Sequence, residues 1–252
     1  MNVQMSDINT ENKQPSSEPV HTSAQLLSQL GLKGTSLIAS VSYHETQIPK
    51  QGMDLWLTKL SVTKKLTPFK NQYRQLDLDL SCVLLDDDIN VIKTIWFGDL
   101  GDNHTIYHLG DGLAGAKNFE EQLINQEEIH IRLPLLLEKI PKATYLLFFI
   151  SSFYHHPLYQ AKKGLIKLMD NEGNSLHKLS LSQISKEASA LLIYQLTKID
   201  DEFLLSVPNI VLNSDNQNAK QFIKSLTDFA KNHVALEKSK NHISNLKSSN
   251  SQ

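Results

Sequence analysis

Acidic residues crowd the middle of the chain. Between Asp77 and Glu128 there are twelve Asp and Glu residues and two Lys or Arg residues, so this stretch has a formal charge of −10, whereas the rest of the chain carries +8. Neighbouring carboxylates repel one another unless a positive charge lies between them. Calcium suits such a place, because it binds six to eight oxygen ligands from carboxylates and backbone carbonyls. The stretch therefore indicates either a calcium site or an acidic surface of ordinary Asp-rich turns.

Other residue types that carry chemistry occur in patterns that argue against a catalytic site. Cys82 is the only cysteine, which excludes an internal disulfide and a cysteine-based zinc site, and its place in an apolar row predicts a core residue. His155 and His156 are adjacent, so their side chains rarely face the same way, and we interpret them as part of a surface loop. No Walker A, Rossmann or G-x-S-x-G motif occurs. We expect no enzymatic activity.

Several blocks of the sequence resemble one protein family. Residues 76–85, LDLDLSCVLL, resemble the D-L-D-(A/C)-S-x-x-x-L strand of the TerD-type tellurium-resistance and stress-response proteins, and residues 107–115, YHLGDGLAG, are similar to that family's H-x-G-D-N-x-T-G. Residues 133–150 and 164–173 resemble the family's L-x-x-(V/I)-P segment with its apolar strand, and its closing hairpin. The resemblance covers roughly residues 50–212 and implies a calcium-binding β-sandwich.

The same resemblance implies where calcium would bind. The family's D-D-E falls at Glu120-Glu121-Gln122, whereas two of its glycine positions hold Lys117 and Phe119 in this chain. Because Lys117 brings an amine into an acidic loop, we expect one calcium site rather than two. The expected metal ligands are Asp77, Asp79, Asp99, Asp111, Glu120 and Glu121.

Alternation of apolar and polar side chains predicts a chain built mainly of β-strands. Residues 76–84 alternate in the way typical of a half-buried strand, and residues 127–133 alternate like an edge strand. Residues 144–153 are nearly all apolar and predict a central strand buried on both faces. Further strands are expected over residues 35–43, 53–64, 91–97, 104–108, 164–169, 175–181, 188–197 and 203–212. About 8–10 strands with short connections predict an all-β sandwich.

Helices are expected to be few. Residues 24–30 and, after a proline, residues 135–140 are predicted to form short helices. Residues 219–236 place large apolar side chains at helical spacing and predict an amphipathic helix that either docks on the sandwich or meets a partner. The interaction residues expected on this helix are Phe222, Leu226 and Phe229.

The chain is predicted to hold one domain with a tail at each end. Residues 1–34 are expected to be mostly disordered, because the first part is polar and buries too little surface to offset its ordering entropy. Residues 35–212 form the predicted sandwich, and residues 213–252 the C-terminal helix and a flexible tail. The sequence has no apolar run of eighteen residues and no signal-peptide pattern, so a cytoplasmic location without a membrane span is expected.

Two functions remain open at this point. One is a non-enzymatic calcium-binding stress-response protein of the tellurium-resistance type, in which the metal holds acidic loops in shape for a partner. The other is a metal-free protein-interaction module that keeps the same β-sandwich and uses the C-terminal helix for assembly. Calcium and other proteins are the expected partners. No nucleic acid is expected, because the basic residues form no dense helix.

Overall fold

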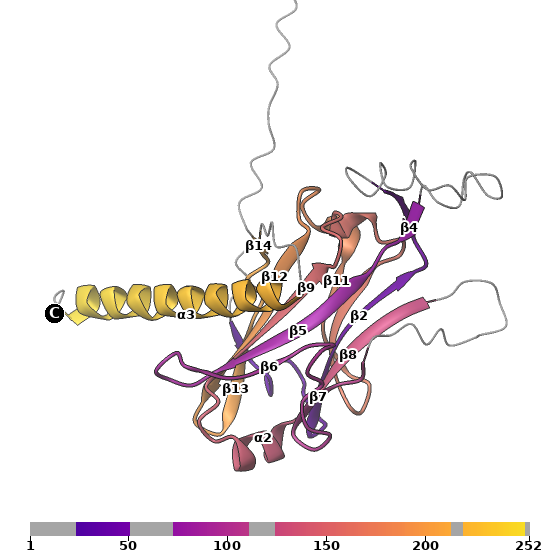
Figure 1. The fold of residues 1–252 in the computed structure, drawn as a ribbon. Helices are drawn as coiled ribbons and strands as arrows, with labels where there is room; N and C mark the ends of the chain where they lie inside the picture. The colour runs from indigo at the N-terminus through magenta and orange to yellow at the C-terminus, as the bar shows by residue number, and fades with distance from the viewer. Residues whose placement is uncertain (1–23, 51–72, 111–123, 213–218, 250–252) are drawn as a thin grey trace, which may run out of the picture.

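The computed structural model describes residues 24–50, 73–110, 124–212 and 219–249, with side chains described as far as Lys240 (Figure 1). The strand expected over residues 53–64 and the tail expected over residues 1–23 lie outside the described residues.

Strands are the main secondary structure of the described chain. The strands are β1 (Gln25–Leu26), β2 (Ser36–His44), β3 (Gln47–Pro49), β4 (Tyr73–Gln75), β5 (Leu78–Leu85), β6 (Val91–Ile95), β7 (Ile106–His108), β8 (Ile124–Arg132), β9 (Tyr145–Ser152), β10 (Leu165–Asp170), β11 (Ser175–Ser180), β12 (Ala190–Ile199), β13 (Glu202–Ser206) and β14 (Ile210–Leu212). The helices are α2 (Leu133–Lys139) and α3 (Ala219–Ser249), with short 3₁₀ turns η3 (Leu158–Gln160) and η4 (Leu181–Gln183). In the part of the chain described here, no helix is long and apolar enough to cross a membrane.

The strands form two antiparallel sheets that face each other. Sheet A has the order β1-β13-β12-β9-β5-β6, with β14 also paired to β12, and sheet B has the order β11-β10-β2-β8-β7. A separate ribbon joins β3 to β4. The predicted all-β sandwich is confirmed (Figure 1). Its strands outnumber the expected 8–10. The strands β1, β3 and β4 are only two or three residues long and were not expected, and the strand expected over residues 203–212 is divided into β13 and β14.

The main core lies between the two sheets. Alternate residues of each strand point inward, so the apolar rows of the two sheets meet and lose their contact with water. Burying a Leu, Ile or Phe side chain in such a place contributes about 1.5–3 kcal/mol. Sheet B supplies Leu37, Ala39, Val41, Ile129, Ile131, Ile166 and Leu168, and sheet A supplies Leu78, Leu80, Cys82, Leu84, Leu146, Phe148, Ile150, Leu191 and Ile193.

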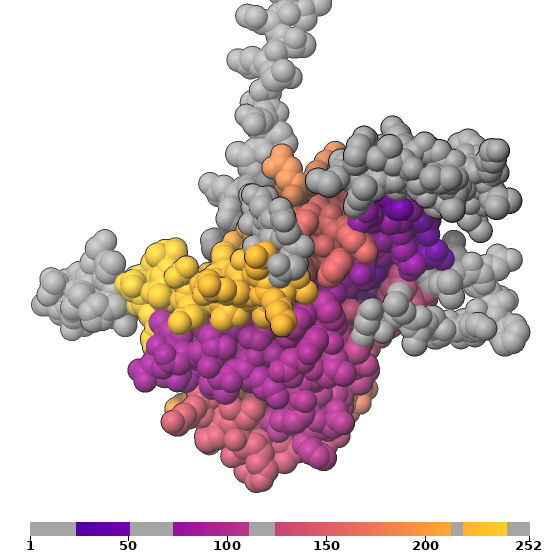
Figure 2. All heavy atoms as spheres, in the orientation of Figure 1, coloured from indigo at the N-terminus to yellow at the C-terminus, as the bar shows by residue number. Residues whose placement is uncertain are grey.

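Helix α3 forms a third layer on the outer face of sheet A. Its buried residues Leu226, Ala230 and Val234 are spaced by four, so they lie on one face of the helix. They pack into a second core with residues of β5, β9 and β12, and Figure 2 shows the helix lying along the surface formed by β5 and β6. Past this contact the helix continues to Ser249 and extends beyond the sheets (Figure 1). The sheet residues of the second core are Val83, Leu85, Tyr145, Leu147, Phe149, Ala190, Leu192 and Leu212.

The helix therefore docks on its own sandwich, which corrects the interaction site expected from the sequence. Leu226 is 1% exposed, so this side chain is covered by the chain itself and its assignment to a partner surface is wrong. Phe229 packs edge-on against Phe149, with 6.2 Å between the ring centroids. Phe222 and Phe229 are only partly buried, and they line a groove between α3 and β14 together with Val211. The sequence correctly indicates an apolar face on this helix, but that face packs against sheet A of the same chain.

Several other predicted elements differ from those in the structure. Residues 78–85 are buried on both faces rather than half-buried, because α3 covers the second face. The expected edge strand at residues 127–133 is β8, an interior strand between β2 and β7. In place of a helix at residues 24–30 there is β1 followed by a turn, and the buried Leu27 removes this segment from the predicted disordered tail. The C-terminal helix ends at Ser249, much later than residue 236.

Candidate functional site

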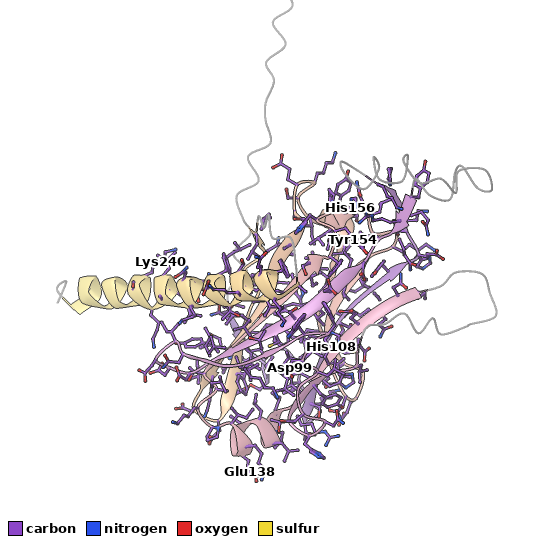
Figure 3. All side chains as sticks on the ribbon, viewed as in Figure 1. Asp99, His108, Glu138, Tyr154, His156 and Lys240 are labelled. Carbon is purple, nitrogen blue, oxygen red and sulfur yellow. The ribbon has the colours of Figure 1, made fainter. Side chains whose placement is uncertain are left out.

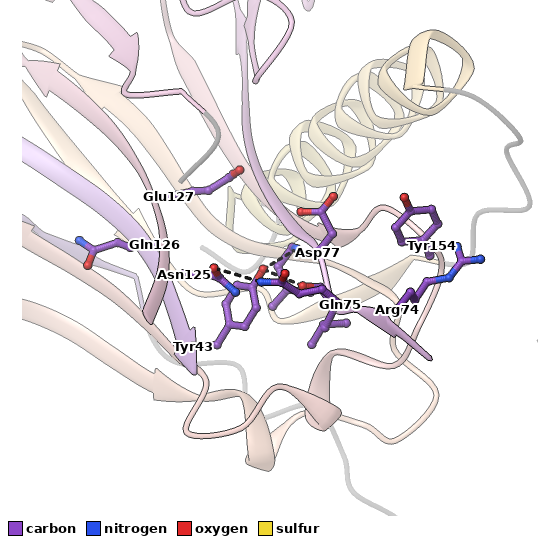
Figure 4. Close-up of a pocket in the computed structure, with 10 residues that line it drawn as sticks. Tyr43, Arg74, Gln75, Asp77, Asn125, Gln126, Glu127 and Tyr154 are labelled. Atoms are coloured by element: carbon purple, nitrogen blue, oxygen red, sulfur yellow. Dashed lines mark hydrogen bonds between the residues drawn. The ribbon is translucent and has the colours of Figure 1, made fainter. Parts of the chain in front are cut away.

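A pocket opens at one end of the sandwich, where strands of both sheets meet. It has a volume of about 180 Å³. Figure 4 shows Asp77 and Glu127 among the residues that line it. We call it the inter-sheet pocket. Its lining residues are Tyr43, Arg74, Gln75, Leu76, Asp77, Leu78, Asn125, Gln126, Glu127 and Tyr154.

Glu127 is the most unusual residue of the inter-sheet pocket. It lies on the inward row of β8, where only 4% of the residue is exposed. Its Oε2 accepts a hydrogen bond of 2.6 Å from the backbone N–H of Leu80 on the opposite sheet. This N–H is free for a side chain because β6 pairs with β5 only from Cys82 onward. The other oxygen, Oε1, is buried and has no hydrogen-bond partner among the described residues.

His108 is the basic side chain paired with Glu127. It is 2% exposed on β7, and its Nε2 lies 3.3 Å from Glu127 Oε2. Its Nδ1 accepts a 2.9 Å hydrogen bond from the backbone N–H of Gly110. A ring nitrogen that accepts carries no proton, so Nδ1 is unprotonated. Nε2 is close to Glu127 but makes no hydrogen bond among the described residues.

Tyr43 fixes the backbone around Asp77. Its hydroxyl donates to the carbonyl of Leu76 and accepts from the N–H of Leu78, both at 3.1 Å. Burial raises the pKa of Tyr43, and the nearby carboxylates Asp77, Glu127 and Asp79 raise it further, so the phenol stays protonated. Because Tyr43 holds the residues on both sides of Asp77, it determines where the Asp77 carboxylate enters the pocket.

The rim of the pocket combines a positive charge with exposed aromatic rings. The guanidinium of Arg74 lies 4.0 Å from the centre of the Tyr154 ring, which is cation–π geometry. Tyr154 is 43% exposed and packs edge-on against Phe153, which is 42% exposed. The interior of the pocket therefore offers oxygen ligands to a cation, whereas its rim presents a cation and apolar rings.

The ligand residues expected from the sequence are only partly brought together. Asp77 lines the pocket, whereas Asp79, which is 9% exposed, is not among the lining residues. Asp99 is exposed in the turn after β6, where its Oδ1 accepts the backbone N–H of Gly101 at 3.1 Å. Figure 3 shows Asp99 near His108, whose backbone N–H donates to the carbonyl of Leu100.

The other expected ligands, Asp111, Glu120 and Glu121, lie outside the described residues. Within residues 24–50, 73–110, 124–212 and 219–240, no group of three or more His, Cys, Asp or Glu side chains is arranged to hold a metal ion. Asp77, Asp79 and Asp99 thus do not form a complete site by themselves.

Sequence reasoning missed Glu127 and His108. The sequence pattern could have indicated Glu127. The alternation of β8 puts it in the same inward row as Ile129 and Ile131, where charged residues are rare. His108 likewise occupies the inward row of β7, two residues after the buried Ile106. A charged or titratable residue in the apolar phase of a strand is the pattern that would have found both.

The comparisons with known proteins agree with the resemblance seen in the motifs. The chain is 30% identical over 109 residues to the tellurium resistance protein TerZ of Serratia marcescens, a match that spans 43% of this chain and 52% of TerZ. The chain resembles tellurium-resistance proteins. The match spans about half the length of this curated relative. No protein-family model matches the chain.

Two solved structures have a similar arrangement of strands. One is the crystal structure of a homologue of telluride resistance protein (TerD) from Streptomyces coelicolor A3(2), with a TM-score of 0.49 and 10% identity over 73% of this chain and 93% of the other. The second is a crystal structure of a protein of unknown function, with a TM-score of 0.48 and 14% identity over 75% of this chain and 95% of the other.

Proposed function

We propose that this chain is a divergent, non-enzymatic protein of the TerD type that binds one calcium ion at the inter-sheet pocket. Asp77 and Glu127 would be its carboxylate ligands among the described residues. The observation that carries the proposal is the Glu127 carboxylate, which is 4% exposed and has an oxygen without a hydrogen-bond partner. The ligands expected at Asp79, Asp99, Asp111, Glu120 and Glu121 stay predictions.

A buried carboxylate with one oxygen that accepts no hydrogen bond needs a counter-charge or a proton. Moving an ionised group out of water is costly unless it is paired, and Asp77 in the same pocket adds a second negative charge. A dication would neutralise both. The lining includes carboxylate and amide oxygens, such as those of Asp77, Glu127 and Asn125. Calcium and magnesium prefer such ligands, whereas structural zinc sites favour sulfur and nitrogen. When bound, calcium would supply a fixed positive charge that joins the two sheets.

The similarity to TerZ supports a role in tolerance to tellurium compounds. Direct reduction of an oxyanion by this chain is poorly supported. Cys82 is completely buried in the core, and burial raises the pKa of its thiol well above the usual range. We therefore propose that the protein acts through a metal-stabilised shape rather than through thiol chemistry.

Replacing Glu127 by Gln tests the proposal. Glu127→Gln keeps the shape of the side chain and an oxygen that accepts the Leu80 N–H, but it removes the charge. We expect the Kd for calcium, measured by isothermal titration calorimetry, to rise by about tenfold or more, because a charged ligand has become neutral.

The neighbouring residue provides a matched control. Glu128 points to the other face of β8 and bonds to His130 Nε2 at 2.6 Å, so Glu128→Gln should leave the calcium Kd nearly unchanged. An equal loss of calcium affinity in both variants would indicate a general effect of charge rather than a binding site. A wild type that binds no calcium, together with a Glu127→Gln variant that is at least as stable, would favour the metal-free interaction module instead.

A further inference from the structure

A hydrogen bond between His177 and Tyr194 joins the two sheets at the edge of the main core. The Nδ1 of His177 on β11 lies 3.1 Å from the Tyr194 hydroxyl on β12, and the two rings pack edge-on with 5.4 Å between their centroids. Since β11 belongs to sheet B and β12 to sheet A, the contact crosses the sandwich. Neither residue lines the inter-sheet pocket.

Tyr194 needs a hydrogen-bond partner where it lies. The pairing of β12 with β9 is irregular between Leu192 and Tyr194, and both Ile193 and Tyr194 pack into the main core. Tyr194 is completely buried, and a buried phenol without a partner is costly. Burial raises the pKa of Tyr194, so the hydroxyl keeps its proton. The arrangement that satisfies this hydroxyl has it donate to an unprotonated Nδ1 of His177.

His177 lies on the edge strand β11, which pairs with β10 alone among the described strands. Its partner in the register is the buried Leu168, so the half-buried imidazole is on the face that meets the core. Lys167 and Lys178 pair at the next position and therefore lie on the opposite face. Burial, and not a neighbouring charge, lowers the pKa of His177. Tyr194 is thus the titratable group that faces it.

We infer that the His177–Tyr194 hydrogen bond is an acid-sensitive link between the sheets: when His177 takes up a proton at Nδ1, the Tyr194 hydroxyl loses its acceptor and the edge strand β11 separates from the core. The inference goes beyond the proposed function and does not depend on calcium binding. Separation of β11 would uncover the edge of β10, whose backbone groups would then be available to pair with another strand.

The direction of the effect follows from the pKa of His177. A histidine in an unfolded chain has a pKa of about 6.5. Because burial lowers the pKa of His177 in the folded chain, the opened state binds a proton more tightly than the closed state. The stabilising effect of the link is therefore complete above about pH 6.5 and is lost as the pH falls below that value.

Hydrogen–deuterium exchange of the wild-type full chain tests the inference without a variant. After correction for the intrinsic pH dependence of exchange, we expect the opening of β11 to increase about threefold or more between pH 7.5 and pH 5.0. The central strand β9 should change much less, since it pairs on both sides. No increase at β11, or an equal increase in both strands, would overturn the inference.

A substitution that cannot titrate identifies the group responsible. His177→Asn keeps an acceptor near the position of Nδ1 and takes up no proton in this pH range, so the acid-induced opening of β11 should disappear. His104→Asn is the control, because His104 is exposed in the turn before β7, and it should retain the wild-type response. Retention of the response in His177→Asn would show that another group causes it and would refute the link.

Tyr194→Phe separates the hydrogen bond from the burial of the imidazole. At pH 7.5 this variant should open β11 more often than wild type, because the bond is missing. At pH 5.0 the two proteins should agree within about twofold, because wild type has lost the same bond. A ratio that stays constant across pH would mean that the hydroxyl has no part in the response. With the wild-type measurement, this comparison decides the matter even if His177→Asn fails to fold.

Discussion

Buried carboxylates in this chain differ in role because they differ in the number of hydrogen bonds that they accept. Asp170, at the end of β10, is 1% exposed and accepts hydrogen bonds from the backbone N–H groups of Lys33, Gly34, Glu172 and Asn174. Burial alone would raise its pKa, but these donors and the Asn174 side chain outweigh burial and hold the pKa of Asp170 far below its usual range. Glu127 has one such donor for one oxygen and none for the other. Asp170 is thus a structural residue, whereas Glu127 is a candidate ligand.

The role of Asp170 predicts a pH-dependent loss of stability. Its pKa is lower in the folded chain than the value of about 3.9 in the unfolded chain, so its stabilising effect is complete above that value. The effect is lost as the pH falls through the acid range toward the folded pKa. Asp170→Asn should therefore lower the melting temperature by several degrees at pH 7 and by less near pH 3, where part of the stabilising effect has been lost.

The exposed Glu172 at the tip of the same hairpin supplies the control for that measurement. Glu172→Gln should leave the melting temperature unchanged at both pH values. An Asp170→Asn deficit of the same size at pH 7 and pH 3 would show that the charge of Asp170 has no part in it.

At the scale of the element, α3 decides how sheet A is buried. A sheet with one apolar face would need nothing on its other side, but β5 and β9 carry Val83, Leu147 and Phe149 on the outer face as well. Leu226 and its neighbours on α3 remove this surface from water. Deleting the helix would expose it, so we expect a chain cut after Leu212 to be unstable or aggregated.

Two leucines of α3 allow the contribution of the helix to be measured. Leu226→Ala removes a side chain that is 1% exposed and should reduce the free energy of unfolding by about 2–5 kcal/mol. Leu236→Ala, at a position that is 55% exposed, should change it by less than about 0.5 kcal/mol. Urea unfolding followed by circular dichroism measures both, and equal effects would contradict the observed docking of α3.

At the scale of the whole molecule, the chain forms three layers, and sheet A is the middle one. Sheet A packs against sheet B through one core and against α3 through the other. The inter-sheet pocket lies where strands of both sheets meet, so a cation bound there would connect Asp77 next to sheet A with Glu127 of sheet B. Binding and folding are then linked, because the unfolded chain does not bring these carboxylates together.

This linkage predicts the thermal response of the protein. At a calcium concentration a hundred times the Kd, a ligand that binds only the folded state adds about 2.7 kcal/mol, which corresponds to a rise in melting temperature of about 5–10 °C for a chain of this size. Magnesium should raise it less, because it requires tighter octahedral geometry and loses water reluctantly. Differential scanning calorimetry in calcium, magnesium and chelator makes the comparison, and superimposable curves would speak against a cation between the sheets.

The sequence by itself determined where most of the longer described strands lie. Residues 144–153 have too many consecutive apolar side chains for a surface strand, and the structure confirms them as the fully buried β9. The proline before residues 135–140 correctly indicated the start of α2. These features are local, because side-chain spacing along a strand or helix follows directly from backbone geometry.

Only the tertiary structure decided what each apolar face packs against. Alternation in β5 marked Leu78, Leu80 and Leu84 as buried, but nothing near them in sequence shows that α3, more than 130 residues later, covers the opposite face. The candidate site also depends on tertiary structure. Glu127 contacts the Leu80 N–H and His108, and both lie on other strands. Periodicity shows that a residue is turned inward, whereas its partner depends on strand pairing between distant segments, which local spacing does not specify.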